Sequence, residues 1–267
     1  MIFDTHVHSI ASPDSKMCAK EAIHVLVQKG LGVVFTEHVD YIVSDGRDPN
    51  ATDYWAKGKK DFVCNFDIYP SSYQNLRSAS VLLGLEIGLT AAYFEKNKTT
   101  AEGDYDFILG SIHSVDGIDV YFDFPEDDVA NFISRYLTYS REMVELCGFF
   151  DAFGHVDYVA RYDAEAQKLF RYENFSREFD GLLLALAERD KAMEINTVGL
   201  SKFDQYEGIL LPIYKRFAEL GGKFCTLGSD THDVSRLGQH IDKAKRLAES
   251  AGLTVVYYKG RKRYVCE

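Results

Sequence analysis

The sequence predicts an α/β fold, a distorted TIM-like (β/α)7 barrel with a metal site at the C-terminal rim of its strands. Short apolar, β-branched runs alternate with longer amphipathic segments along the chain, which is typical of β–α units around a parallel sheet. The first apolar run ends in His-Val-His rather than in a glycine-rich phosphate loop. This favours a barrel over an open dinucleotide-binding sheet.

Hydrophobic periodicity sets the expected elements. Strands are expected at Met1–Thr5, Gly32–Thr36, Ser80–Glu86, Phe107–His113, Phe149–His155, Ala192–Asn196 and Lys223–Ser229, with a last one at Thr254–Tyr258. Helices are expected at Cys18–Lys29, Asp127–Cys147, Asn174–Asp190, Tyr206–Leu220 and Leu237–Ala251. The long, polar stretch Tyr41–Ala79 is expected to be an insertion that acts as a lid or a substrate-specificity loop.

Composition narrows the class of protein. A chain of 267 residues with 46% hydrophobic residues suits a single domain spanning residues 1–267. It shows no membrane span and no signal peptide, and its five scattered cysteines favour the reducing cytoplasm. The net charge of −11 disfavours nucleic acid as a partner. The basic cluster Lys259–Arg263 is expected to be a solvated tail.

Metal-ligating residue types gather where the expected strands end. Their positions, in chain order, are His6 and His8, His38, Glu86, His113, His155, Glu194 with Asn196, and Asp230 with His232. The C-terminal ends of barrel strands meet on one rim, so these side chains are expected to converge. Imidazole and carboxylate together suit zinc, manganese or iron.

Each of these residues also has an ordinary explanation. A single histidine at a strand end is more often a hydrogen-bonded structural residue than a ligand, and Asp14 in S-P-D fits a helix N-cap or a turn. The metal site is therefore predicted from the whole set, because a chance gathering at six strand ends is improbable. His24 and His240 fall in expected helices and are assigned no role.

The ordered motifs H-x-H, T-E-H, L-E-I-G, S-I-H-S, G-H-V-D and S-D-T-H resemble those of the polymerase and histidinol phosphatase (PHP) family. The resemblance runs over nearly the whole chain. The segments Phe153–Tyr162 and Met193–Thr197 are most similar to the family's bacterial histidinol-phosphate phosphatases. The resemblance implies hydrolysis of the phosphomonoester L-histidinol phosphate, in histidine biosynthesis, by a hydroxide that bridges metal ions.

The resemblance also implies a ligand set for three divalent transition-metal ions, zinc, manganese or iron. One ion would take His6, His8, Glu86 and Asp230; a second would share Glu86 and add His113 and His155; a third would take Asp14, His38 and His232. Family members often have histidine at the position of Asp14. The harder carboxylate ligand here is expected to change the metal preference or the affinity of the third site.

Substrate contacts follow less directly from the sequence. Arg161 is expected either to clamp phosphate or to pair with Asp157 or Asp163. Glu194 and Asn196 are expected to contact the substrate or to support the ligands.

The sequence also offers candidates for a cation near the substrate and for the proton donor to the leaving group. Val198 stands where some relatives have arginine, so Lys202 is expected to supply the positive charge. The most plausible proton donor to the leaving alkoxide is Asp230 or His232.

Two other functions stay open. One is a PHP phosphoesterase of different specificity, acting on phosphotyrosine or on nucleotides and nucleic acid. The other is a metal-binding scaffold without activity, which the intact ligand set disfavours. The sequence leaves the oligomeric state and the native metal undetermined.

Overall fold

A computed structural model describes residues 1–41, 62–125, 127–202 and 205–267. Its main sheet follows the order β1-β2-β4-β5-β8-β9-β10-β11-β12. The first seven of these strands are mutually parallel, as predicted for seven β–α units. Their bounds are β1 Phe3–Val7, β2 Gly32–Asp40, β4 Val81–Gly88, β5 Phe107–Ser111, β8 Ala152–Phe153, β9 Ala192–Asn196 and β10 Phe224–Gly228.

The barrel is distorted where β1 and β10 meet. Strand β11 (Thr254–Lys259) pairs with the start of β10 and continues into the antiparallel strand β12 (Lys262–Val265). Beyond the end of β10, the backbone N–H of Asp230 donates to the carbonyl of His6 over 2.7 Å, and that of His8 donates to Thr231 over 3.0 Å. Within the described residues no continuous ladder joins β1 to β10, so these bonds connect the two strands at the C-terminal rim only.

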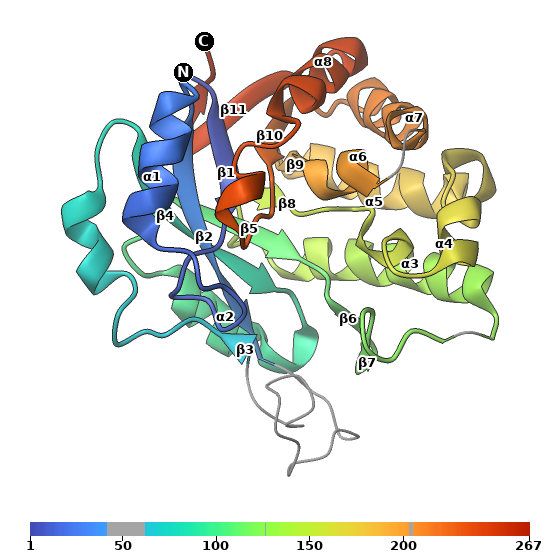
Figure 1. Ribbon diagram of the computed structural model, residues 1–267. Coiled ribbons are helices and arrows are strands. Elements are labelled where there is room, and N and C mark those ends of the chain that lie inside the picture. Colours follow the sequence, from blue (N-terminus) through green and yellow to red (C-terminus); the bar gives the residue numbers. More distant parts are fainter. Residues whose placement is uncertain (42–61, 126, 203–204) are drawn as a thin grey trace.

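The helices lie around the outside of the strands (Figure 1). The five predicted helices are confirmed, with ends shifted by up to four residues: α1 Ala19–Gln28, α3 Val129–Leu146, α5 Ser176–Glu188, α7 Tyr206–Glu219 and α8 Ile241–Ala251. Short additional helices are α2 Phe94–Ala101, α4 Ala164–Leu169 and α6 Thr197–Lys202. At six to eight residues they span about two turns, too few for a clear 3.6-residue period.

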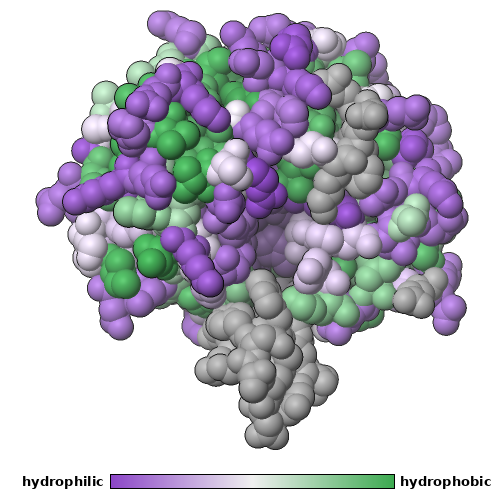
Figure 2. Space-filling model, viewed as in Figure 1, coloured by the Kyte–Doolittle hydropathy of each residue, from purple (hydrophilic) through white to green (hydrophobic). Residues whose placement is uncertain are grey.

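The inward face of the strands changes from apolar to polar toward the rim. In β4 the alternating positions are Leu82, Gly84 and Glu86, and in β2 they include Val34 and His38. Alternate residues of a strand share a face, so the apolar side chains form a lower layer and the ligand types form an upper one. Figure 2 shows a hollow near the C-terminal ends of the strands, edged largely by hydrophilic residues.

The β11–β12 hairpin closes the opposite, N-terminal end. Val256 and Tyr258 join the lower apolar layer. In the turn between the strands, Arg261 donates from Nε to the carboxylate of Asp151 over 2.6 Å. Arg263 pairs with Asp190 over 2.5 Å. The expectation that Lys259–Arg263 is a solvated tail is therefore wrong, because acidic groups at the barrel end hold two of its arginines.

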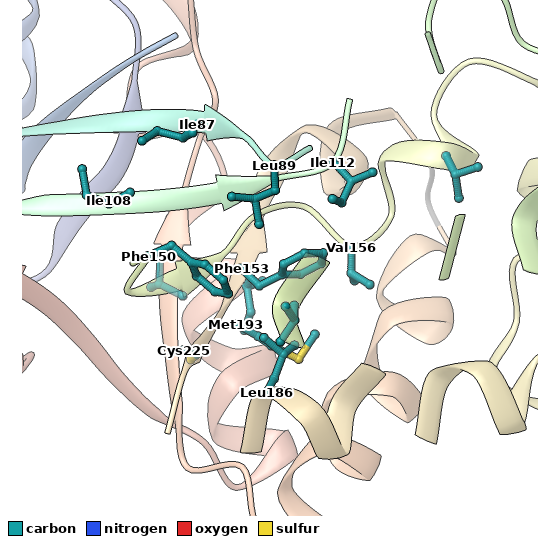
Figure 3. Close-up of a cluster of buried hydrophobic side chains, with 14 of the residues drawn as sticks. Ile87, Leu89, Ile108, Ile112, Phe150, Phe153, Val156, Leu186, Met193 and Cys225 are labelled. Atoms are coloured by element: carbon teal, nitrogen blue, oxygen red, sulfur yellow. The ribbon is translucent and has the colours of Figure 1, made fainter. Parts of the chain in front are cut away.

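A second apolar layer lies between the strands and the helices (Figure 3). Ile87, Ile108, Phe153 and Met193 point outward from four strands and meet Leu186 of α5, and all five side chains are buried. Full burial of one such side chain contributes about 1.5–3 kcal/mol. This layer fixes the strands whose inner faces carry the polar residues.

Several short elements connect the longer strands and helices. They are β3 Phe62–Val63, β6 Ser114–Val115 and β7 Ile118–Asp119, with 3-10 helices at Ser71–Leu76, Ala91–Tyr93, Tyr158–Ala160, Tyr172–Asn174 and Val234–Arg236. Strand β3, which lies within the predicted insertion Tyr41–Ala79, pairs antiparallel with β2. Residues 42–61 lie outside the described part of the chain, and the prediction of a lid rests largely on them. No described helix has the length and apolar character needed to cross a bilayer.

Candidate metal centre

Two histidines of β1 and its end face two carboxylates. His6 Nε2 lies 3.2 Å from Glu86 Oε2 and 3.6 Å from Asp230 Oδ1. His8 Nε2 lies 3.5 Å and 3.4 Å from the same two oxygens. Ligand atoms about 2.1 Å from a tetrahedral ion lie about 3.4 Å apart, so these spacings suit a single cation.

The other oxygen of Glu86 faces two further histidines. Glu86 Oε1 lies 2.7 Å from His155 Nε2 and 3.2 Å from His113 Nε2. The two ring nitrogens lie 3.3 Å apart. Glu86 comes from the middle strand β4 and is fully buried, so one carboxylate serves two ligand groups.

A third group lies at the edge of the cluster. Asp14 Oδ2 lies 2.9 Å from His232 Nε2 and 3.5 Å from His38 Nε2. The two histidine nitrogens are 3.3 Å apart. The structure thus brings all nine predicted ligand residues together at one rim, and their division among three ions stays a prediction.

Unpaired polar atoms support a cation at this rim. Of the ten buried side-chain polar atoms without a hydrogen-bond partner in the described residues, five belong to the cluster: His6 Nε2, His8 Nε2, His38 Nδ1, His155 Nδ1 and Glu86 Oε2. A buried polar group without a partner costs about 1–3 kcal/mol. Three of the five, His6 Nε2, His8 Nε2 and Glu86 Oε2, face one another at the first ligand group. The residues present therefore fit a bound divalent ion there, which would give these three atoms a partner.

Neighbouring carboxylates set the proton positions on two of the histidines. His6 Nδ1 lies 2.6 Å from Glu194 Oε1, and His113 Nδ1 lies 2.9 Å from Asp40 Oδ1. An ionised carboxylate only accepts hydrogen bonds, so each Nδ1 carries a proton, and Nε2 is the nitrogen through which each ring would bind a cation.

The carboxylate of Asp230 is held by donors on its outer side. Its Oδ2 accepts from Arg161 Nη1 over 3.0 Å and from Asn196 Nδ2 over 3.3 Å. Its backbone adopts the left-handed conformation (φ 50°), which is uncommon for a residue other than glycine. The strain is offset by the hydrogen bond from its backbone N–H to β1, and Oδ1 is left facing His6 and His8.

The charge states of the cluster follow from burial and proximity. Burial opposes ionisation of Glu86, but the nearby His6, His113 and His38 hold its pKa well below the usual range. Burial likewise disfavours the charged form of His6, but Glu194, Glu86 and Asp230 raise its pKa. Burial lowers the pKa of His8. A buried anion surrounded by imidazoles is an arrangement that suits a metal ion.

The residues predicted to contact substrate have hydrogen-bond partners within the protein. Arg161 is 3% exposed and donates from Nε to Asp157 over 3.0 Å, in addition to its contact with Asp230. Glu194 accepts from the backbone N–H of His155 over 2.8 Å and from Asn196 over 3.1 Å. These contacts place the three residues directly behind the ligands, and their contact with substrate stays a prediction. The side chain of Lys202 lies outside the described residues.

A cavity of about 360 Å³ opens above the cluster. Its described lining comprises Asp14, His38, Asp40, Tyr41, Phe62, Glu86, Gly88, Leu89, Thr90, His113, Ser114, Gly117, Asp119, Tyr121, Phe122, His155, Tyr158, Tyr162, Asp230 and His232. The described lining includes aspartates and a glutamate but neither lysine nor arginine, so an anion there would need a bound cation.

Several residues that line this site were not predicted from the sequence. Asp40 follows His38 by two positions on β2, so strand alternation pointed to it. Tyr158 and Tyr162 form one wall, with ring centroids 5.3 Å apart. They lie only three and seven residues beyond His155, but nothing in the local pattern separates them from the chain's other aromatic residues.

Comparison with known proteins agrees with this geometry. The family model for the PHP domain matches residues 4–198. This chain belongs to the PHP domain family. A probable histidinol-phosphatase of Clostridium acetobutylicum is 36% identical, with 98% of each chain covered. The histidinol-phosphatase of Lactococcus lactis is 31% identical, over 93% of this chain and 91% of its own length.

Solved structures show the same fold. The histidinol phosphate phosphatase of Lactococcus lactis, in complex with zinc, L-histidinol and phosphate, has a TM-score of 0.85 at 27% identity and covers 100% of this chain and 99% of its own. A putative histidinol phosphatase of Listeria monocytogenes has a TM-score of 0.71 at 17% identity, over 90% and 98%. The predicted family is confirmed, and the likeness extends over the whole length.

Proposed function

We propose that this protein is a metal-dependent phosphomonoesterase that hydrolyses L-histidinol phosphate to L-histidinol and inorganic phosphate. The observation that carries the proposal is the three ligand groups beneath a cavity whose described lining has neither lysine nor arginine. A phosphate dianion would be repelled by the acids there unless cations neutralised them. Relatives of matching length named histidinol-phosphatase support the substrate.

The nine ligand residues would hold three divalent transition-metal ions in the groups described above. Bound ions would activate water as a nucleophile and neutralise the negative charge that develops on the phosphate. Zinc in the Lactococcus lactis relative supports this choice of metal, and manganese and iron suit the same donors. Metal analysis of the purified protein should give about three equivalents per chain.

The third ion is the one whose presence is tested most directly. The variant Asp14→Ala should lose one equivalent, because His38 and His232 would remain as the only ligands of that group. The matched variant Asp14→His restores the residue type common in relatives and should keep all three. Retention of three equivalents by Asp14→Ala would remove Asp14 from the ligand set.

The walls of the cavity suit the organic part of the substrate. Tyr121 and Tyr162 lie with ring centroids 4.6 Å apart at its mouth, and both are partly exposed. Aromatic faces favour a flat or cationic ring. Asp119, which also lines the cavity, would favour the ammonium or imidazolium group of histidinol phosphate.

Proton delivery to the leaving alkoxide is assigned to Asp230 or His232, the two candidates from the sequence. Both oxygens of Asp230 already face donors or ligand nitrogens. His232 Nδ1 lies 3.2 Å from the carbonyl of Asp230. Substitution His232→Gln should therefore lower kcat for substrates with a poor leaving group more than for p-nitrophenyl phosphate.

One panel of substrates tests the function. Protein loaded with zinc or manganese is assayed on histidinol phosphate, p-nitrophenyl phosphate, a phosphotyrosyl peptide and single-stranded DNA. We expect histidinol phosphate to give the highest kcat/KM, above about 10⁴ M⁻¹s⁻¹. Preference for the peptide or for DNA would point to another phosphoesterase specificity, and metal binding without turnover of any substrate would indicate a scaffold. We place the enzyme in the cytoplasm, in keeping with its free cysteines.

A further inference from the structure

Glu37 is a fully buried carboxylate that none of the roles above uses. It precedes His38 on β2, and strand alternation turns it away from the barrel interior. Both of its oxygens accept from the backbone N–H of Ser9 over 3.1 Å. It also accepts from the hydroxyls of Ser9, over 2.5 Å, and Ser12, over 2.6 Å. No described lysine or arginine pairs with it.

The hydroxyl of Ser12 stands between Glu37 and a ligand histidine. A serine hydroxyl carries a single hydrogen, and the short contact with the carboxylate uses it. Every other contact of Ser12 Oγ must therefore be one in which it accepts. The backbone N–H of His38 donates to it over 3.1 Å, and the remaining neighbour is His8 Nδ1 at 3.3 Å.

This inventory of hydrogens fixes the tautomer of His8. Because Ser12 can only accept, the proton of the neutral imidazole lies on Nδ1, and Nε2 keeps its lone pair. Nε2 has no hydrogen-bond partner and faces Glu86 and Asp230 at 3.5 and 3.4 Å. His6 reaches the same state through a direct contact with Glu194, whereas His8 reaches it through Ser12.

The same carboxylate also holds the loop that follows β1. Its bonds to Ser9 fix the start of that loop, and the hydroxyl of Ser15 donates to the carbonyl of His8 over 3.0 Å. Asp14 lies between these anchors. The ring of His8 stacks against those of His38 and His232, with centroid separations of 4.0 and 4.2 Å. A turn of the His8 ring would therefore disturb the first and third ligand groups together.

We propose that Glu37 and Ser12 are positioning residues for the metal centre: Glu37 keeps Ser12 as a hydrogen-bond acceptor, and Ser12 holds His8 as its Nδ1-protonated tautomer, ready to bind a cation through Nε2. The proposal rests on the proposed metal centre, but it concerns a proton position that exists before any ion binds. It assigns a role to the glutamate of the T-E-H motif, whose histidine alone was expected to act.

The test starts with nitrogen NMR of the imidazole groups in the metal-free protein at neutral pH, with His8 assigned from the spectrum of His8→Asn. In the wild type, His8 should be protonated on Nδ1. In Glu37→Gln the side-chain amide can donate to Ser12, which frees the Ser12 hydroxyl to donate to His8 Nδ1. The proton should then move to Nε2. Ser12→Ala should give a mixture of the two tautomers, and Ser12→Thr should restore the wild-type state.

Metal affinity is the second measurement, made by titration of the metal-free proteins with zinc. Glu37→Gln and Ser12→Ala should bind about 10- to 100-fold more weakly, the usual effect of removing a partner of a ligand histidine. Tyr73→Phe is the matched control: its hydroxyl contacts Ser9 Oγ over 2.7 Å, so it removes a bond from the same cluster without touching Ser12. It should bind zinc within about 2-fold of the wild type.

The outcomes separate the two proposals. His8 protonated on Nε2 in the wild type would overturn the inference without any variant, even if a substitution at Glu37 prevented folding. Equal zinc affinity in Glu37→Gln, Ser12→Ala and Tyr73→Phe would overturn it as well. If the tautomer and affinities come out as expected but no histidinol phosphate is hydrolysed, the proposed function fails and the positioning role stands.

Discussion

The largely buried acids Asp106 and Asp151 at the N-terminal end of the barrel have hydrogen-bond donors within the protein, whereas several polar groups at the C-terminal rim have no partner among the described residues. At the N-terminal end, Asp151 accepts from Arg261 and from the backbone N–H of Ile108. Asp106 accepts from the backbone N–H groups of Leu83 and Gly260. At the rim, ring nitrogens of four ligand histidines and an oxygen of Glu86 have no hydrogen-bond partner among the described residues.

This difference indicates that the N-terminal end contributes mainly to stability and the C-terminal rim mainly to function. Paired charges at the closed end hold the β11–β12 hairpin against the strands, and they do not require a bound ligand to be satisfied. Unpaired nitrogens and oxygens at the rim are costly in the free protein, and a bound cation would remove the part of that cost that comes from His6, His8 and Glu86. Substitutions at the closed end should therefore lower the free energy of unfolding, whereas those at the rim should lower metal content and activity.

The largest effect is expected for Glu86→Ala. Glu86 serves two ligand groups. Removing a hydrogen-bond partner of a ligand usually lowers metal affinity or activity about 10- to 100-fold, and removing a shared ligand should cost more. We expect kcat/KM to fall by more than about 100-fold. Metal content per chain should fall in the same sample, with an unchanged circular dichroism spectrum. A variant that keeps its metal and its activity would contradict the shared role.

Glu194→Gln should have the next largest effect. Its carboxylate lies 2.6 Å from His6 Nδ1, and replacing it should weaken zinc binding or activity by about 10- to 100-fold. Asp151→Asn is the matched change at the closed end and should leave zinc affinity unaltered while lowering stability. Equal effects of the two substitutions on zinc affinity would argue against the separation of the two ends.

Arg261→Ala tests the closed end directly. It leaves the largely buried Asp151 without its cation, and because Arg261 is partly exposed the loss should be about 2–3 kcal/mol, less than for a fully buried pair. The melting temperature should fall by roughly 5–10 °C. With saturating metal, kcat should match the wild type at 25 °C. A loss of kcat without a loss of stability would show that the hairpin acts on the rim.

The smallest effect is expected at the exposed pair of Asp190 and Arg263. The hydrogen bond from Arg263 lowers the pKa of Asp190, so the folded state favours the ionised carboxylate. The resulting stabilisation is present above the ordinary pKa of about 3.9 and is lost as the pH falls through the lowered value. Asp190→Asn should cost less than about 1 kcal/mol at pH 7.

Urea unfolding of metal-free wild type and Asp190→Asn from pH 3 to pH 7 checks this prediction. The difference between the two proteins should shrink as the pH falls. A difference that grows toward acid pH would have the wrong sign for a carboxylate with a lowered pKa. Asparagine tolerates the left-handed backbone at this position (φ 53°), so the change tests the charge rather than the turn.

The sequence predicted the bounds of some strands correctly, but not those of strands in which only a few residues pair with a neighbour. The predicted bounds of β9 are those observed, whereas β8 is only Ala152–Phe153 within the predicted Phe149–His155. An apolar run indicates burial, and Phe150 and His155 of the predicted run are buried without belonging to the ladder. Strand β12 was not predicted because Lys262 and Arg263 do not form an apolar alternation. The strand is held by contacts that form only in the folded protein, such as the hydrogen bond from Arg263 to Asp190.

The sequence by itself determined the order of the β–α units and eight of the nine candidate ligands, because periodicity and the chemistry of side chains are local properties. Asp14 became a candidate only through the family resemblance. Tertiary structure alone decided that Arg161 and Asn196 hold Asp230 from behind, and that Asp40 and Glu194 hold ligand histidines. These contacts join residues up to 188 positions apart. Their geometry depends on how the strands close around one another, which no local pattern records.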